Sequence, residues 1–127
     1  MPLARKIFIL EKVGLGTAAI RNVGAGANQI PDMSSFSTTS TSQLLPGGKK
    51  LLWGGGVYQG SAGSTGSVVT FPTAFPSTCY IVLFLDVGGG VNRLSGVPIS
   101  RAQFRCWGKD GSDAFSTTNF NYLAIGE

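Results

Sequence analysis

Short apolar runs alternate with turns rich in glycine and serine over the second half of the chain. The runs recur at intervals of roughly ten residues, a spacing typical of strands in an antiparallel sheet. We expect strands at residues 49–58, 67–71, 78–86, 91–99, 100–109 and 120–127. The pattern predicts an all-β fold, a six-stranded antiparallel β-sandwich.

Two of the expected strands are distinguished by where their apolar residues fall. Residues 78–86 are apolar on both faces, which indicates a strand in the centre of the sandwich or at a subunit contact. Residues 100–109 alternate, with Ala102, Phe104 and Cys106 on one face and Arg101, Gln103, Arg105 and Trp107 on the other. A third strand, 49–58, is interrupted by glycines 54–56, where we expect a bulge.

Two Phe-Pro pairs, Phe71-Pro72 and Phe75-Pro76, separate the expected strands 67–71 and 78–86. Proline cannot donate to a sheet ladder, so the first pair should end one strand and the second should delay the next. Each proline also favours an extended backbone at the phenylalanine before it. We expect both phenylalanines to point inward and to cap one end of the sandwich.

The N-terminal third lacks a lasting helical or strand period. Residues 1–12 are compatible with one or two helical turns or with a strand. Residues 13–33 combine glycines with isolated apolar residues that one copy of the chain cannot bury, although several copies wound together could share them. Residues 34–48 form a Ser/Thr tract ending in Pro-Gly-Gly, which predicts a linker. We therefore divide the chain into an extended glycine-rich segment, 1–48, and a sandwich domain, 49–127, which is small for an independent core. The excess apolar content of residues 78–86 and the glycine-rich segment both favour an oligomer.

Composition narrows the classes of function. The net charge of +4 comes from scattered residues rather than a basic stripe with interleaved aromatics, so no nucleic-acid binding is expected. Ordinary surface charge and a patch that attracts anionic groups both remain open. No run is long enough to span a membrane, so we expect no membrane insertion. The chain has no histidine and no Cys-x-x-Cys pair, so we expect no metal and no cofactor.

The two cysteines, Cys79 and Cys106, both lie in expected strands. We interpret them as small buried hydrophobic residues. A disulfide between them stays open, because spacing in the sequence does not determine whether two cysteines meet.

Two stretches resemble a known family. "GSVVTFPTAFPSTCYIVLF", residues 66–84, and the closing "NYLAIGE", residues 121–127, are similar to the C-terminal domain of bacteriophage tail-fibre proteins. "GLGTAAIRNVGAGANQIPDMSSF", residues 14–36, resembles the segment that joins fibre shafts to their tips. Residues 1–12 do not resemble a fibre shaft, so the chain is open to interpretation as a prophage remnant, a short gene product or a fragment.

The resemblance implies an H-type-lectin-like sandwich that assembles as a parallel homotrimer and binds sugars. It also implies a place at the tail-fibre tip of the virion, after assembly in the bacterial cytoplasm. The implied partners are a host cell-surface glycan, such as lipopolysaccharide, and other tail-fibre or virion proteins. The alternative is a purely structural fibre or baseplate component.

We expect binding rather than catalysis. Asp110 and Asp113 are close enough in sequence to be considered as a carboxylate pair for glycoside hydrolysis, but aspartates in a Gly/Ser loop usually make turn hydrogen bonds. Sugar binding needs an aromatic face with planar hydrogen-bonding groups, and arginine adds contacts to phosphate or carboxylate. The candidates are Arg101, Gln103, Arg105, Trp107, Lys109, Asp113, Phe115 and Asn119.

Other positions carry weaker or competing interpretations. Trp107 and the arginines would equally suit a subunit interface, which uses the same residue types. Asn92 and Arg93, after a glycine turn, form a weaker candidate site. We expect Trp53 to lie in the core or at an interface.

Overall fold

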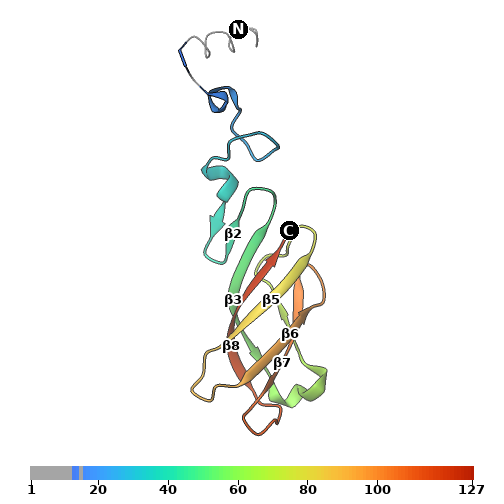
Figure 1. Ribbon diagram of the computed structural model, residues 1–127. Helices are drawn as coiled ribbons and strands as arrows, with labels where there is room; N and C mark the ends of the chain where they lie inside the picture. Colours follow the sequence, from blue (N-terminus) through green and yellow to red (C-terminus); the bar gives the residue numbers. More distant parts are fainter. Residues whose placement is uncertain (1–12, 15) are drawn as a thin grey trace.

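The computed structural model describes residues 13, 14 and 16–127. The choice between helical turns and a strand for residues 1–12 lies outside them. The described chain has an N-terminal segment leading away from a β-sandwich, with the C-terminus at the end of the sandwich from which that segment emerges (Figure 1). Within residues 13–14 and 16–127, no helix is long and apolar enough to cross a membrane.

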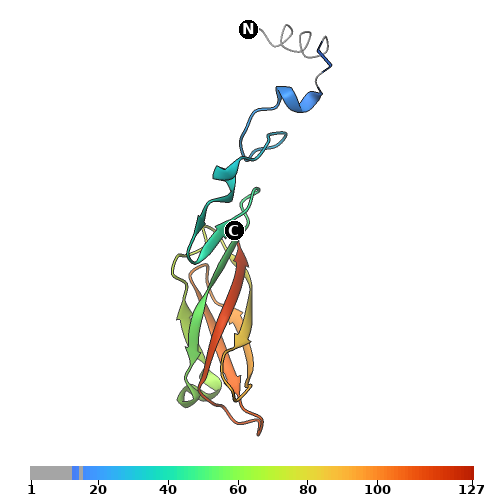
Figure 2. The same cartoon turned by 90° about the vertical axis from the view of Figure 1, so that its left-hand side faces the viewer.

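Two antiparallel sheets pack face to face, which confirms the predicted all-β sandwich (Figures 1 and 2). The five-stranded sheet has the order β1-β2-β3-β8-β5, and the three-stranded sheet has the order β4-β7-β6. The strands are β1 (Thr38–Thr39), β2 (Ser42–Leu44), β3 (Lys50–Tyr58), β4 (Ser67–Thr70), β5 (Cys79–Asp86), β6 (Arg93–Pro98), β7 (Gln103–Lys109) and β8 (Thr118–Gly126). Short 3-10 helices are η1 (Thr17–Ile20), η2 (Met33–Phe36) and η3 (Gly60–Thr65). Each of the six predicted strands is present, while β1 and β2 lie in the tract expected to be a linker and extend the sheet beyond β3.

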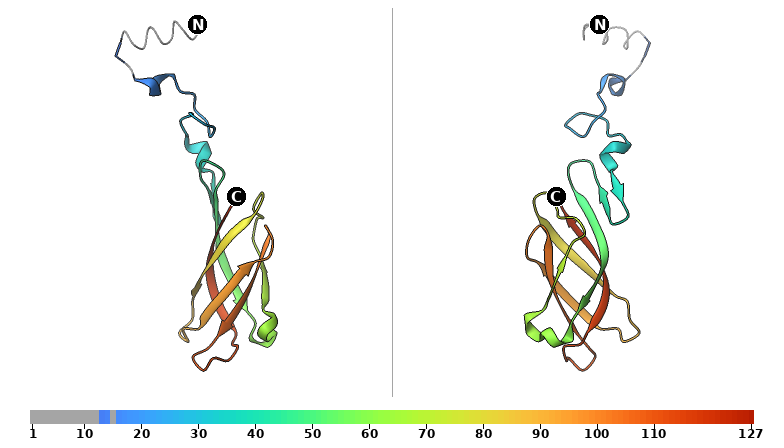
Figure 3. Two further views of the ribbon diagram at one scale, coloured as in Figure 1. Left: turned by 45° about the vertical axis from the view of Figure 1, so that its right-hand side comes forward. Right: turned by 180° about the vertical axis from the view of Figure 1, so that it is seen from behind.

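The strands β3 to β8 run along the sandwich, so the loops between them gather at its two ends. The end near the C-terminus carries the loops at residues 71–78 and 99–102. The other end, which we call the distal end, carries η3 and the loops at 87–92 and 110–117; it lies farthest from the N-terminal segment (Figures 1 and 3).

The expected bulge at glycines 54–56 is wrong. β3 pairs with β8 residue for residue through this stretch, and the register shift lies instead in β5, between Cys79 and Ile81. Two of these glycines, Gly54 and Gly56, instead allow the aromatic side chains of β8 to pack against β3. A Cβ atom at Gly56 would lie 2.7 Å from the ring of Phe120, so only glycine leaves room for that ring.

The prediction that residues 78–86 run through the centre of the sandwich is also wrong. β5 is the last strand of the five-stranded sheet and pairs only with β8 in the described chain. Its inward side chains include the buried Val82, whereas Ile81, Leu83 and Leu85 face outward and are exposed. The other interpretation, a subunit contact, stays a prediction.

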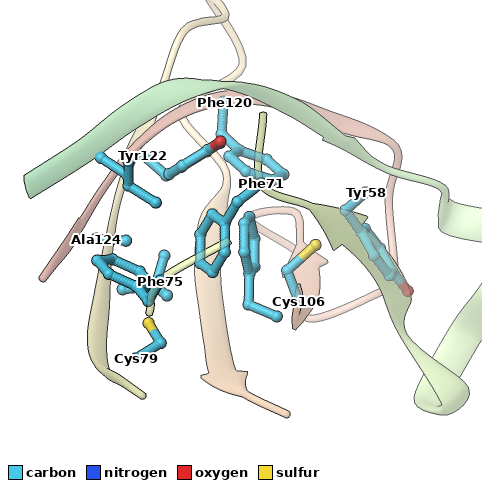
Figure 4. Packing of buried hydrophobic residues seen from close by; sticks show 11 residues of the cluster. Tyr58, Phe71, Phe75, Cys79, Cys106, Phe120, Tyr122 and Ala124 are labelled. Carbon is cyan, nitrogen blue, oxygen red and sulfur yellow. The ribbon is translucent and has the colours of Figure 1, made fainter. Parts of the chain in front are cut away.

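Aromatic rings fill the space between the sheets. The buried hydrophobic residues are Leu52, Tyr58, Phe71, Phe75, Cys79, Val82, Phe104, Cys106, Phe120, Tyr122 and Ala124. Figure 4 shows Phe75, Cys79 and Ala124 together at one end of this cluster and Tyr58 at the other. Phe71 and Phe75 meet edge to face, with ring centroids 5.3 Å apart, a favourable aromatic geometry.

The Phe-Pro pairs form the predicted corner. The amides of Phe71 and Phe75 donate to the carbonyls of Ala102 and Arg101 (2.9 Å each), which attaches the corner to the loop before β7. Both rings point inward, as predicted, and β4 ends at Thr70, before the first proline.

Both cysteines are buried and free, which confirms their interpretation as small hydrophobic residues and excludes the disulfide in this structure. Burial raises the pKa of the Cys106 thiol to about 11. The thiol is therefore protonated near neutral pH and unreactive.

The C-terminal residue is held by a small polar cluster. Glu127 accepts hydrogen bonds from Lys49 and from the Tyr80 hydroxyl, and the Lys49 ammonium lies 5.0 Å from the centroid of the Tyr80 ring. The hydrogen bond from Lys49, followed by that from Tyr80, lowers the pKa of Glu127 below its usual value of 4.5.

This lowered pKa predicts an acid-sensitive contribution to stability. A carboxyl group with a depressed folded-state pKa stabilises the fold above its unfolded pKa, and the contribution disappears as the pH falls through the folded value. We expect Glu127→Gln to lower the thermal midpoint slightly at about pH 7, because exposed ion pairs contribute little. The difference from wild type should vanish below the lowered pKa in a pH series of thermal denaturation curves. An unchanged difference across that series would contradict the assignment, and Lys49→Gln should show the same pH dependence.

Candidate functional site

The outward face of β7 carries the polar and aromatic residues predicted from its alternation. Phe104, Cys106 and Gly108 are buried, while the residues between them lie on the outer side of the sheet and are half-buried. Two of these outward side chains bind neighbouring backbone. The Arg105 guanidinium donates to the carbonyl of Thr65 (2.7 Å), and the Trp107 indole N–H donates to the carbonyl of Ser64 (2.9 Å). These two side chains therefore hold η3 against the sheet.

The indole ring of Trp107 is partly covered by its neighbours rather than fully exposed. Its ring lies over Gly66, where an added Cβ atom would sit 2.8 Å from ring atoms. Gly66 has a φ of +79°, a conformation that glycine adopts without strain. The indole is half-buried and packs against the core, so one side of it remains available.

A depression of about 350 Å³ opens beside the Trp107 ring at the distal end. It is formed where β6 begins, β7 ends and two distal segments, η3 and the loop 110–117, come together. Its lining residues are Ser64, Arg93, Leu94, Ser95, Trp107, Gly108, Lys109 and Phe115. The depression thus combines two aromatic rings, two cations and two hydroxyl groups at the end farthest from the N-terminal segment.

Asp113 links the two cations of this depression. Its carboxylate accepts a 2.6 Å hydrogen bond from Arg93 and lies 3.5 Å from the Lys109 ammonium. The hydrogen bond from Arg93 is the main cause that lowers the pKa of Asp113. The Lys109 ammonium also lies 4.9 Å from the centroid of the Phe115 ring, within cation–π range.

The two aspartates of the 110–117 loop have different partners. Asp110 accepts hydrogen bonds from the amides of Ser112 (2.8 Å) and Ala114 (3.1 Å), the turn role expected for it. A glycosidase acid needs a raised pKa, whereas that of Asp113 is lowered.

The structure brings together four of the predicted site residues and separates the others. Trp107, Lys109 and Phe115 line the depression, and Asp113 lies at its edge. Arg105 lies one position further along the same face. Gln103 and Arg101 lie toward the opposite end, where they donate to the Thr70 hydroxyl and the Phe75 carbonyl, and Asn119 lies on the other sheet.

Four lining residues were missed by the sequence reasoning, and Arg93 was only a weak candidate; the four are Ser64, Leu94, Ser95 and Gly108. Arg93 pairs directly with Lys109 in the β6–β7 register, which no local pattern reveals. Its neighbour Asn92 donates to the Thr118 hydroxyl (2.8 Å), a contact that ties the 87–92 loop to β8.

A second surface lies on the opposite side of the sandwich. The outward side chains of β3, β5 and β8 form a continuous surface, which we call the apolar face. It consists of Leu51, Trp53, Gly55, Val57, Ile81, Leu83, Leu85, Asn119, Asn121, Leu123 and Ile125. None of these residues is charged. Trp53 is half-buried on this face and donates to the carbonyl of Ser40 (2.9 Å), so the expectation of a core position for it is wrong, and an interface position stays a prediction.

Residues 43–127, more than half of the chain, match the family described as "Putative tail fiber protein gp53-like, C-terminal". The chain therefore belongs to this family of tail-fibre C-terminal domains, which confirms the resemblance drawn from its sequence.

Among solved structures, the chain is similar to the C-terminal part of the R2 pyocin fiber from P. aeruginosa, with 17% sequence identity and a TM-score of 0.44. The similarity covers 65% of this chain but only 22% of that one. No curated protein matches the chain.

Proposed function

We propose that this domain is the receptor-binding tip of a bacteriophage tail fibre and binds a host-surface glycan without catalysis. The main support for this proposal is the distal depression, which is lined by Trp107 and Phe115 together with Lys109, Arg93 and two serines. Sugar sites combine an apolar aromatic surface with a few fixed polar groups, and this depression offers both. Its place at the end opposite the N-terminal segment suits a tip whose other end is joined to a fibre (Figure 2).

The apolar face supports a homotrimer. Contiguous exposed apolar surface on a soluble protein usually marks an interaction site, and this one has no charge to resist burial. The described N-terminal segment adds further exposed apolar side chains, namely those of Val13, Ile20, Val23, Ile30 and Met33. Neighbouring copies that wind together would cover both surfaces.

A threefold axis would also bring the three candidate glycan sites to the same end of the assembly. Copies related by an axis along the sandwich run in the same direction, so three distal depressions would gather at one end. The depression lies on the three-stranded sheet, opposite the apolar face, and stays open after trimerisation. Three weak sites presented together gain affinity through avidity. In this trimer the three sandwiches adopt the H-type-lectin-like arrangement, and the trimer is located in the virion.

Phe115→Ala tests the depression as the glycan site. Phe115 is 39% exposed and outside the core, so its removal should leave the fold intact. We expect glycan binding to weaken at least about fivefold, the effect of losing an aromatic contact worth roughly 1 kcal/mol. Binding is measured on a glycan array and on host cells, with equal thermal midpoints showing that the fold is unchanged.

Ile99→Ala serves as the matched control. Ile99 is an exposed hydrophobic residue directly after β6, at the far end of the same sheet. The Ile99→Ala variant should bind glycan as tightly as the wild type does. Equal losses of glycan binding in both variants would contradict the assignment of the depression as the glycan site. Absence of any glycan signal, with tight binding to another virion protein, would favour the structural alternative.

A further inference from the structure

Arg93 and Lys109 occupy an unusual arrangement for a surface sheet. They are directly opposite each other on neighbouring antiparallel strands, at the mouth of the distal depression. Like charges in this position repel and destabilise the pair of strands. Arg105 precedes Lys109 by four residues on the same outward face, so that face carries a third cation.

The strands themselves supply no counter-ion. The outward positions of β4, β6 and β7 carry no carboxylate in the described chain; they are Val68, Thr70, Arg93, Ser95, Val97, Gln103, Arg105, Trp107 and Lys109. The counter-charge comes from Asp113 in the 110–117 loop, which contacts both Arg93 and Lys109. Asp110 in the same loop accepts from two backbone amides and closes the turn. One carboxylate therefore stands against two cations at the mouth of the depression.

Asp113 is held in a way that permits displacement. Its side chain is 69% exposed, and exposed ion pairs contribute little to stability because water competes with them. Its φ of +64° is in the left-handed region, which a non-glycine residue adopts at some cost. An incoming anion could replace its carboxylate without uncovering any buried group.

We propose, building on the function proposed above, that the distal depression selects an anionic sugar and that Asp113 is an internal counter-ion displaced by the anionic group of the ligand. Arg93 and Lys109 then bind that group, while the glycan ring lies against Phe115 and Trp107. Carboxylates and phosphates share the chemistry that these cations recognise, so uronic acids and phosphorylated hexoses both qualify.

The sign of one mutational effect tests this role. Asp113→Asn removes the internal counter-ion, so the variant should bind anionic oligosaccharides about two- to fivefold more tightly, the range expected for one exposed charge contact. Binding of the matched neutral oligosaccharide should not change. Arg93→Gln should weaken binding of the anionic sugar more than binding of the matched neutral one. The probes are immobilised oligosaccharides that carry a uronic acid, a phosphorylated hexose or the corresponding neutral hexose, and comparison of the first two separates carboxylate from phosphate.

Asp110→Asn is the matched control, since it makes the same change of charge in the same loop and keeps an oxygen for the turn. Enhanced binding in Asp113→Asn alone supports the proposal. Equal enhancement in both variants would reduce the effect to overall charge and overturn it. Weaker binding by Asp113→Asn would also overturn it, because Asp113 would then contact the sugar itself. Neutral and anionic sugars bound equally by all variants would overturn the inference while the proposed function stands, whereas no binding to any sugar would overturn both.

Discussion

Replacing Leu83 with aspartate is expected to convert the proposed trimer into folded monomers. Leu83 lies in the middle of the apolar face, opposite Leu123 in the β5–β8 register. It is 49% exposed in the single chain and lies outside the core, so the sandwich does not depend on it. In a trimer, each copy would bury a carboxylate against a face without cations, and an unpaired buried charge costs several kcal/mol. Light scattering should show the mass fall from three times 13.2 kDa to 13.2 kDa.

Val97→Asp is the control for this experiment. Val97 has a similar exposure, 46%, but lies on the outward face of the three-stranded sheet, opposite the proposed interface. This variant should remain trimeric. A monomeric wild type at about micromolar concentration would contradict the trimer, and dissociation of both variants would contradict the choice of face.

Replacing Phe104 with alanine is expected to cause the largest loss of stability of any single change in the core. Its ring is fully buried and lies between Phe71 (5.4 Å), Phe84 (5.6 Å) and Tyr122 (4.9 Å), measured between ring centroids. Removal of a buried aromatic ring leaves a cavity that rigid neighbours fill poorly, at a cost of about 3–5 kcal/mol. A small domain has a total stability of about 5–15 kcal/mol, so this variant should be largely unfolded or close to unfolding.

Chemical denaturation at a fixed protomer concentration measures this loss, because the stability of an oligomer depends on concentration. Phe104→Leu keeps most of the apolar volume and should cost much less. A loss below about 1 kcal/mol for Phe104→Ala would mean that the aromatic cluster is not the main stabilising element.

Local patterns predicted much of this fold. Alternation along residues 100–109 predicted which side chains of β7 point inward, because successive residues of a strand face opposite sides whatever the rest of the chain does. The prolines after Phe71 and Phe75 predicted the corner before β5, because proline restricts its own backbone and that of the residue before it.

Two errors show where local patterns fail. The apolar run 78–86 looked like a central strand, but a strand at a sheet edge whose outer face is apolar has the same sequence. Glycines 54–56 looked like a bulge, but Gly54 and Gly56 leave room for the rings of Tyr122 and Phe120 on β8, more than sixty positions away. Neither distinction is encoded within one strand, because each depends on which other strand lies alongside.

The sequence by itself determined the six main strands, the inward face of residues 103–109, the family and the aromatic and basic residue types of the candidate site, because these follow from local alternation, turn residues and short motifs. The tertiary structure alone decided that Arg93 stands opposite Lys109, that Asp113 reaches both, and that the distal depression and the apolar face lie on opposite sides of the sandwich. The physical reason is that strand order and register are set by packing and hydrogen bonding between segments far apart in the chain.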